Sequence, residues 1–543
     1  MPALTMSSSH GSLAVAALFT TFLLFAAPQP ALASGGFLQH KGDVSTADVE
    51  MSLISELVGL VADDGRLIEL EAALRQTFES LPKNSHGRLG HEAVRYVLHR
   101  FFVHRHGWFI KGLEPGGDTW HASASTDGPA AFLKEWVPSY LQELLEKRLG
   151  GRGVDLRELS VLAATLKDLI RKEAAGRMQE SYRTLALPMD SVVSQAQAGN
   201  ALELYVASYL GAGNFSTSQS PEEAMVRLEA WANKYPGWSD VELWLGEIEK
   251  SHLAKTGVDG PTFPAARRAA EQVGESFHGL NDRECGSLKS TLLEIEGKQP
   301  GRVPLAEFYR KSLYSHWKFS EKVGYLRDLG ALDESDPERP MVIVPNYVGA
   351  RPNCLEASGL YAVCCRNECE DLMGHLEREI AAPAAEPARL AELVAALPSP
   401  TVAAPRNLSA TLLGRLQEVA ETHGGHVQLH GRLFAQWMHH AFPRECPYPH
   451  EAGKTNPQTP DEWMQETGAE DTEASEEERQ EHVESCSEAQ DTAVVELPWS
   501  VQEELLPASG RPQPPKENRK AHIVLLVIAV SAALVAVAAL PAT

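Results

Sequence analysis

Five of the seven cysteines lie between Val342 and His450, and this cluster holds the residue types best suited to chemistry. A thiolate can attack a substrate or bind zinc, but nearby positive charge is needed to lower the thiol pKa. Only Arg366 is adjacent to the cluster. We therefore predict structural disulfides rather than a zinc or redox site, although reduced core thiols remain an alternative. The predicted disulfide cysteines are Cys354, Cys364, Cys365, Cys369 and Cys446.

Three of these cysteines are expected on one helix that begins after Cys354 and continues through Leu376. The neighbouring Cys364 and Cys365 should not bond to each other, because that small ring is strained. We expect Cys446 to close back onto this helix. A bridge from Cys446 to Cys369 would enclose 77 residues, and the chain-entropy model gives it about 4 kcal/mol of stabilisation. An odd total of seven leaves at least one cysteine free or intermolecular.

Histidines form a second group that could do chemistry, because neutral imidazole is a common metal ligand. Their spacing matches no standard site, and the stretch from His91 to Arg95 departs from the zinc-protease pattern where Arg95 replaces the second histidine. The sequence also lacks a nucleophile elbow, a phosphate-binding loop and a dinucleotide fingerprint. We predict no cofactor and no catalytic residues. Weak metal candidates are His426, His430, His439 and His440.

The elements that must position these residues are predicted to be helices, because apolar residues recur at steps of three and four. Met341–Val344 is the only short β-like run of note. Four places share a Gly-containing loop with apolar residues before a second helix. These are Gly87-Arg88-Leu89, Val154-Asp155-Leu156-Arg157-Glu158-Leu159, Gly301-Arg302-Val303-Pro304-Leu305-Ala306-Glu307-Phe308 and Gly425-His426-Val427-Gln428-Leu429.

These loops resemble degenerate EF-hand loops, in which an apolar residue follows the central Gly and a Glu closes the loop. The resemblance implies paired helix-loop-helix units; the alternative is a set of unrelated helical hairpins. Calcium needs six or more oxygen ligands. The closing Glu survives as Glu158 and Glu307, whereas Ala93 and Gly431 replace it elsewhere, so calcium binding is not expected. The first ligand positions hold Pro82, Lys147, Glu296 and Ala420 instead of Asp.

Both ends of the chain are apolar. Leu13–Ala27 followed by Ala31-Leu32-Ala33 is typical of a cleaved signal peptide, although no Lys or Arg precedes it. His522–Leu540 is nearly long enough to span a bilayer. Because Ala508-Ser509-Gly510 precedes it at a suitable distance, removal in exchange for a glycolipid anchor is the alternative. Both interpretations place a membrane-anchored body in the secretory pathway, with Asn214 and Asn407 in N-glycosylation sequons.

The formal net charge of -24 argues against nucleic acid as a partner. Between Asp461 and Glu504 there are 16 acidic residues and one basic residue, Arg479, which predicts a disordered segment. The predicted organisation is a signal peptide at 1–33, helical domains at 34–190 and 191–335, a Cys/His-rich helical domain at 336–450, an acidic disordered linker at 451–521, and a transmembrane helix or removed anchor tail at 522–540.

Three blocks are similar to an uncharacterised family of helical secretory or membrane proteins abundant in dinoflagellate algae. The blocks are His106–Pro115, Asn353–Glu370 and Leu429–His450. The resemblance covers roughly His99–His450 and excludes the acidic segment. It implies no established activity, so it assigns no functional residues.

The sequence therefore favours a membrane-tethered lumenal or extracellular helical protein that binds or scaffolds an unknown protein or glycan partner. One alternative is a lumenal metal- or thiol-dependent enzyme that uses the cysteines and histidines between Cys354 and His450. A calcium-responsive sensor is a further alternative.

Overall fold

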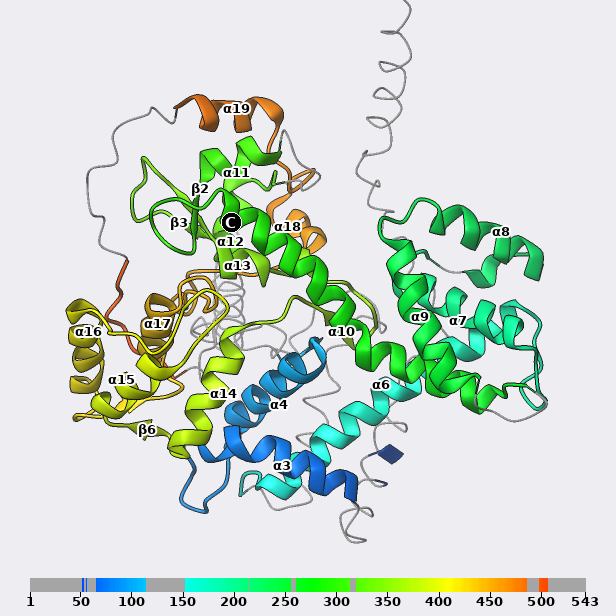
Figure 1. The fold of residues 1–543 in the computed structure, drawn as a ribbon, viewed down its shortest axis with the longest axis horizontal. Helices are drawn as coiled ribbons and strands as arrows, with labels where there is room; N and C mark the ends of the chain where they lie inside the picture. Colours follow the sequence, from blue (N-terminus) through cyan, green and yellow to red (C-terminus); the bar gives the residue numbers. More distant parts are fainter. Residues whose placement is uncertain are drawn as a thin grey trace, which may run out of the picture. The chain divides into compact units, whose positions relative to one another are not determined.

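Helical periodicity leads to a mainly helical fold in the computed structural model (Figure 1). The structure describes residues 51–52, 55, 65–113, 152–213, 215–254, 260–312, 319–485 and 498–505. The predicted signal peptide and the apolar C-terminal segment lie outside these residues. Among the described helices, none is both long and apolar enough to cross a membrane.

The first hydrophobic core contains the N-terminal helices and one small sheet. The antiparallel strands β1 and β5 pair Trp108 with Val363. Helices α6 and α7 share this core, so the predicted domain boundary at residues 190 and 191 does not separate two cores. The elements are α3 (Gly65–Glu79), α4 (His91–His106), β1 (Trp108–Ile110), α6 (Leu156–Thr184), α7 (Gln195–Tyr209), η2 (Phe215–Thr217), α8 (Pro221–Ala232), α9 (Trp238–His252), the first part of α10 (Phe263–Glu294) and β5 (Tyr361–Val363).

The second core begins at the end of α10, which therefore links two cores. Its sheet has the antiparallel order β2-β4-β3, with Val342 opposite both Val303 and Leu332. The predicted β-like run at Met341–Val344 supplies the central strand. The elements are β2 (Arg302–Pro304), α11 (Leu305–Ser312), α12 (Val323–Asp328), β3 (Leu332–Asp333), β4 (Met341–Ile343), α13 (Val344–Val348), η3 (Arg351–Asn353), α18 (Pro460–Thr467) and α19 (Glu476–Ser485).

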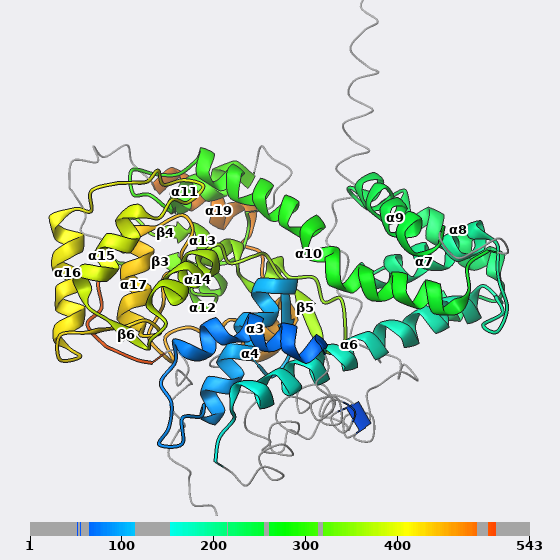
Figure 2. The same cartoon turned by 60° about the horizontal axis from the view of Figure 1, so that its bottom comes forward.

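Helices α18 and α19 show order within residues 451–485, the first part of the segment predicted as disordered at 451–521, of which residues 486–497 and 506–521 lie outside the described residues. Thr459 and Glu462 form a capping box at the start of α18, and Trp463 is buried in the second core. Helix α19 lies beside α11 in both views (Figures 1 and 2). Charge composition alone missed this order because a few apolar side chains anchor an otherwise acidic segment: Trp463 and Ala474 are buried in the second core, and Met464 and Val483 pack against it.

The third core contains two helix-loop-helix units joined by a two-stranded sheet. Ala385 pairs with Val427, and Ala384 pairs with Gln428. Figure 1 shows α15, α16 and α17 gathered in yellow around this sheet. The elements are α14 (Cys369–Ile380), β6 (Ala384–Ala385), α15 (Pro387–Ala396), α16 (Ala410–Glu421), β7 (Val427–Gln428) and α17 (Arg432–Ala441).

The described residues contain three disulfide bonds, which confirms the prediction of disulfides. The bonds are Cys285–Cys365, Cys354–Cys364 and Cys369–Cys446. The predicted common helix is wrong, because Cys364 and Cys365 follow strand β5 and only Cys369 lies on α14. Cys285 on α10 was missed, since an isolated cysteine in a helical stretch carries no signal of its partner.

Candidate functional site

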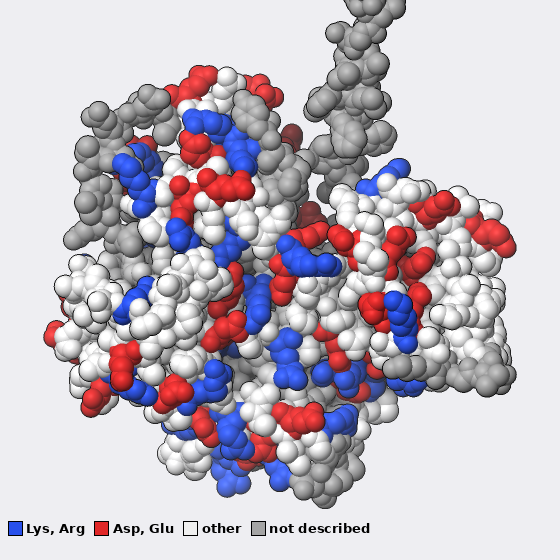
Figure 3. All heavy atoms as spheres, in the orientation of Figure 1, with Lys and Arg blue, Asp and Glu red and all other residues white. Residues whose placement is uncertain are grey.

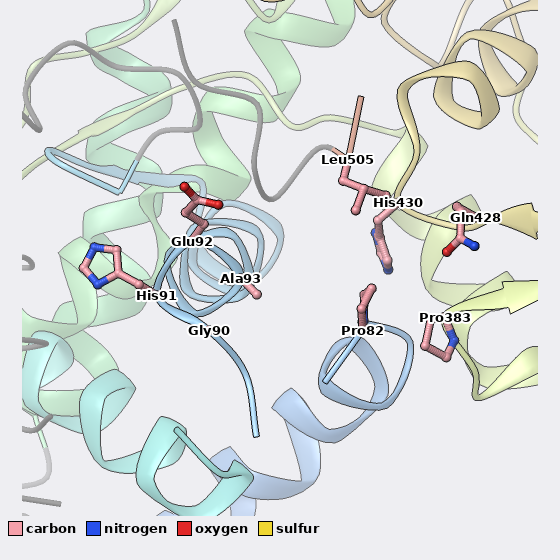
Figure 4. A pocket seen from close by; sticks show the side chains of 9 residues that line it. All are labelled: Pro82, Gly90, His91, Glu92, Ala93, Pro383, Gln428, His430 and Leu505. Carbon is pink, nitrogen blue, oxygen red and sulfur yellow. The ribbon is translucent and has the colours of Figure 1, made fainter. Parts of the chain in front are cut away.

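A cavity of about 300 Å³ lies where the start of α4 faces the β6–β7 sheet (Figure 4). Figure 4 shows His430, Leu505, Pro82 and Pro383 on one side of it, opposite the first turn of α4 with Ala93. The lining residues come from five separate stretches of the chain. They are Pro82, Gly90, His91, Glu92, Ala93, Pro383, Gln428, His430 and Leu505.

Short backbone pairings hold these stretches in place. Leu89 exchanges backbone hydrogen bonds with Val154, at 2.9 and 3.0 Å, which fixes the residue before Gly90. Gly90 is the N-cap of α4 and has extended backbone angles without a side-chain cap. On the opposite side, Leu429 N donates to the carbonyl of Pro383 at 3.0 Å. The cavity walls are therefore backbone turns fixed by hydrogen bonds.

His430 is only 2% exposed and uses both ring nitrogens within the protein. Its Nε2 lies 2.8 Å from Ser80 Oγ, and its Nδ1 lies 3.1 Å from Tyr96 Oη. Ser80 Oγ donates to the Thr77 carbonyl at 2.9 Å, so it accepts from Nε2, and Tyr96 then donates to Nδ1. Burial, together with Arg100, lowers the pKa of His430 to about 3. The imidazole is therefore neutral near pH 7.

An ion-paired carboxylate lies directly behind His430. Glu377 Oε1 is 3.4 Å from His430 Nε2 and also accepts from Arg100. Burial, the largest single influence, would raise the pKa of Glu377, but Arg100, His430 and a hydrogen bond from Gln76 together lower it. Although a serine, a histidine and a carboxylate meet here, Ser80 is fully buried and its proton is committed to Thr77. The cluster therefore supports the cavity wall and presents no exposed nucleophile.

Neither a protein family, nor a curated protein, nor a solved structure matches this chain. The site is therefore interpreted from its own geometry.

The four candidate metal histidines do not form one site. His426 is exposed, whereas His430 lines the cavity. His439 lies 2.7 Å from the Cys446 carbonyl and 3.1 Å from Arg302, and His440 lies against Trp499 with ring centroids 5.5 Å apart. Within the part of the chain that the structure describes, no group of three or more His, Cys, Asp or Glu residues could hold a metal.

Arg302 is a buried site residue that sequence reasoning missed. It is 0% exposed, and its Nε donates to Asp333 at 2.7 Å while Nη1 contacts His439. Burial, the largest single influence, would raise the pKa of Asp333, but Arg302 and hydrogen bonds from Ser335 together lower it. The same guanidinium and burial lower the pKa of His439 to about 3. This network joins the β2-β4-β3 sheet to α17, and its only sequence signal is a basic residue beside the apolar Val303.

The two predicted glycosylation sites differ in what the structure describes. Asn214 lies outside the described residues. Asn407 is exposed in the loop before α16, two residues from Ser409, whose side chain caps that helix by accepting from Leu412 N at 3.1 Å. Asn407 is therefore accessible to a modifying enzyme.

Proposed function

We propose that the protein is a membrane-tethered binding protein of the secretory pathway, with a lumenal or extracellular helical body. The observation that supports a binding role is the cavity between α4 and the β6–β7 sheet. Its volume of about 300 Å³ is at the small end of the usual range for ligand pockets. Its walls combine apolar side chains with a neutral His430 that is fixed by Ser80 and Tyr96.

The lining favours a small, mainly apolar ligand with one hydrogen-bond acceptor. Pro82, Ala93, Pro383 and Leu505 supply apolar contact. Gly90 provides no side-chain cap, and the first turn of α4 gives this wall the partial positive charge of a helix N-terminus, which favours an acceptor group. The carboxylate of Glu92 in the same turn disfavours an anionic ligand.

The disulfides support the proposed compartment, since such bonds persist in secreted and lumenal proteins. They also count against the thiol-dependent enzyme, because all five predicted cysteines are bonded and no thiolate remains among them. The proposed anchor is the apolar segment at 522–540, either as a single-pass helix or as the removed tail of a glycolipid signal.

We also infer that the loop pairs are EF-hand-like units that have replaced the cation with arginine. Leu89 bridges Val154 at the position where paired EF-hand loops would meet. Arg88 Nη1 contacts both oxygens of Glu158, at 3.0 and 2.8 Å, and Nη2 contacts Asp155 at 3.1 Å. A guanidinium therefore occupies the acidic side of this loop pair, which argues against the calcium sensor.

Native mass spectrometry of the purified body, released gently from the membrane, tests the binding role. We expect a co-purifying small molecule in the wild-type protein and its loss in Ala93→Phe, which fills the cavity. Leu243→Phe is the matched control, because Leu243 is 73% exposed on α9. Equal ligand occupancy in wild type and in Ala93→Phe would sink the proposed cavity site.

Membrane anchoring and compartment need a separate test. We expect a tagged full-length chain to stay with membranes after alkaline extraction and to resist protease in intact vesicles. A glycosidase should increase its gel mobility, and Asn407→Gln should remove part of that shift. A protein found in the soluble cytosolic fraction would contradict this part of the proposal.

A further inference from the structure

Residues 498–505, called the strap below, lie along the first turns of α17 as an extended segment. Arg432 on α17 is 1% exposed, and its guanidinium donates to the carbonyls of Gln502 and Ser500 in the strap. The Arg432 backbone N–H also donates to the Glu504 carbonyl at 2.8 Å. The strap thus follows α17 through its own backbone carbonyls.

Gln436, one turn further along α17, contacts the strap backbone in both directions. Its side-chain Nε2 donates to the Ser500 carbonyl at 3.1 Å, and its Oε1 accepts from Ser500 N at 3.1 Å. Every amino acid except proline offers these two backbone groups. Arg432 and Gln436 therefore recognise an extended chain with little regard to its sequence.

Two strap side chains add selectivity. The Trp499 ring contacts side chains of α16 and α17. Its centroid lies 5.5 Å from that of the His440 ring and 5.2 Å from the Arg415 guanidinium. Glu503 accepts from Leu433 N at 3.1 Å, at the positive end of α17, and contacts His423 Nε2 at 2.8 Å. By contrast, Val501 is 79% exposed. This face of α17 therefore selects an aromatic residue four positions before a carboxylate.

Arg432 depends on the strap for part of its hydrogen bonding. Without the strap, Arg432 would lose its Ser500 and Gln502 acceptors and keep only Gln436 and the Pro449 carbonyl. Water would solvate the uncovered guanidinium, but the hydrogen bonds and packing that the strap supplies would be lost. An extended segment of suitable chemistry should therefore replace the strap directly, since it restores the same hydrogen bonds.

We propose that the Arg432–Gln436 face of α17 is a peptide-binding site that the strap occupies in cis. Its ligand is an extended acidic segment of a partner protein, with an aromatic residue four positions before a glutamate or aspartate. This inference goes beyond the proposed function, since it does not require a ligand in the cavity. The strap competes with the partner segment for the site.

A fluorescent peptide with the sequence of Pro498–Leu505 tests the site in the full-length protein. A release variant, Trp499→Ala with Glu503→Gln, weakens the binding of the strap without changing the Arg432–Gln436 face of α17. We expect it to bind the peptide at least about tenfold more tightly than wild type, because a tethered strap competes at roughly millimolar effective concentration. Val501→Ala, at an exposed strap position, should behave like wild type.

Two further variants make the result specific. Gln436→Leu in the release variant should weaken peptide binding by about tenfold, the effect of losing about 1.4 kcal/mol of hydrogen bonding. A peptide with the tryptophan and the glutamate replaced should bind as weakly. Equal peptide affinity in wild type and in the release variant, or no saturable binding in either, would overturn the proposal.

Light scattering decides between a foreign segment and a second copy of this chain. A monomer that binds the peptide supports the proposal. A concentration-dependent dimer that the free peptide dissociates would show that two copies exchange straps at the Arg432–Gln436 face. That result would overturn the proposal of a segment from another protein.

Discussion

At the scale of single residues, several histidines are built into the structure as neutral groups. Burial, followed by Arg95 or Arg302, lowers the pKa of His99 and His439 to about 3. His430 behaves in the same way, and its two hydrogen bonds identify which nitrogen carries the proton. These side chains serve as neutral hydrogen-bonding groups in the interior. Acidification is therefore expected to lower the stability of the fold.

We predict that stability falls on acidification between about pH 6.5 and pH 4. His430 has a pKa of about 3 in the folded protein and about 6.5 when unfolded, so the unfolded chain binds the proton first. The group therefore reduces the unfolding free energy by about 1.4 kcal/mol for each pH unit below 6.5. Urea denaturation at several pH values measures this slope, and His430→Gln should reduce it by one proton.

Tyr96→Phe is the control for this prediction. It removes the hydrogen bond to Nδ1 but leaves the imidazole buried, so it should lower stability by about 1 kcal/mol without changing the slope. An identical slope in wild type and His430→Gln would show that His430 titrates equally in both states.

At the scale of elements, buried polar links decide how the cores are joined. The Arg302–Asp333 pair connects two strands of one sheet, and His439 extends this link to α17. We predict that Arg302→Met lowers the unfolding free energy by about 3 to 5 kcal/mol, because Asp333 is left as an uncompensated buried charge. Urea denaturation measures the loss.

The double variant Arg302→Met with Asp333→Leu tests that explanation. Replacing both charges with apolar side chains should recover most of the lost stability. If the double variant is as unstable as the two single losses combined, the cost arises from packing and the charge argument is wrong.

Disulfides make a second kind of link between elements. Cys369–Cys446 joins α14 to the turn that follows α17, across 77 residues, whereas Cys354–Cys364 spans only 10. We predict that the paired variant Cys369→Ser with Cys446→Ser loses about 4 kcal/mol of unfolding free energy, and that Cys354→Ser with Cys364→Ser loses about 3. Chemical denaturation, with peptide mapping of the remaining bonds, measures both. Unchanged stability in the first variant would contradict its role.

The limits of sequence reasoning are clearest at these links. Periodicity predicted the helical class, and cysteine usage together with the predicted signal peptide predicted disulfides. The cavity wall was beyond reach, because Ser80 and His430 are 350 residues apart and no local pattern encodes such a contact. Cys285 was missed because it stands alone in a helical stretch, 80 residues from its partner Cys365 and outside the cysteine cluster that drew the prediction. The strap was hidden by its acidic composition, which outweighs the few residues that dock.

At the scale of the whole molecule, the formal net charge is -24, yet many acidic side chains in the described residues have a basic partner close by. On the face shown in Figure 3, Lys and Arg side chains are interspersed with Asp and Glu. The helix-loop-helix units follow the same rule. Arg444 contacts both oxygens of Glu296, at 2.9 and 3.0 Å, at the first position of the loop that precedes α11.

This arrangement predicts that calcium leaves the fold unchanged. A calcium ion would have to displace Arg88 from Glu158 or Arg444 from Glu296, and it would find too few oxygens in either loop. At about 5 mM calcium, above the ~10⁻⁴ to 10⁻³ M affinities of extracellular calcium modules, we expect a change in melting temperature below about 1 °C relative to chelator. Arg88→Ala should lower the melting temperature under both conditions, because it leaves Glu158 and Asp155 without their partner. A rise of several degrees that grows with calcium concentration would restore the sensor hypothesis.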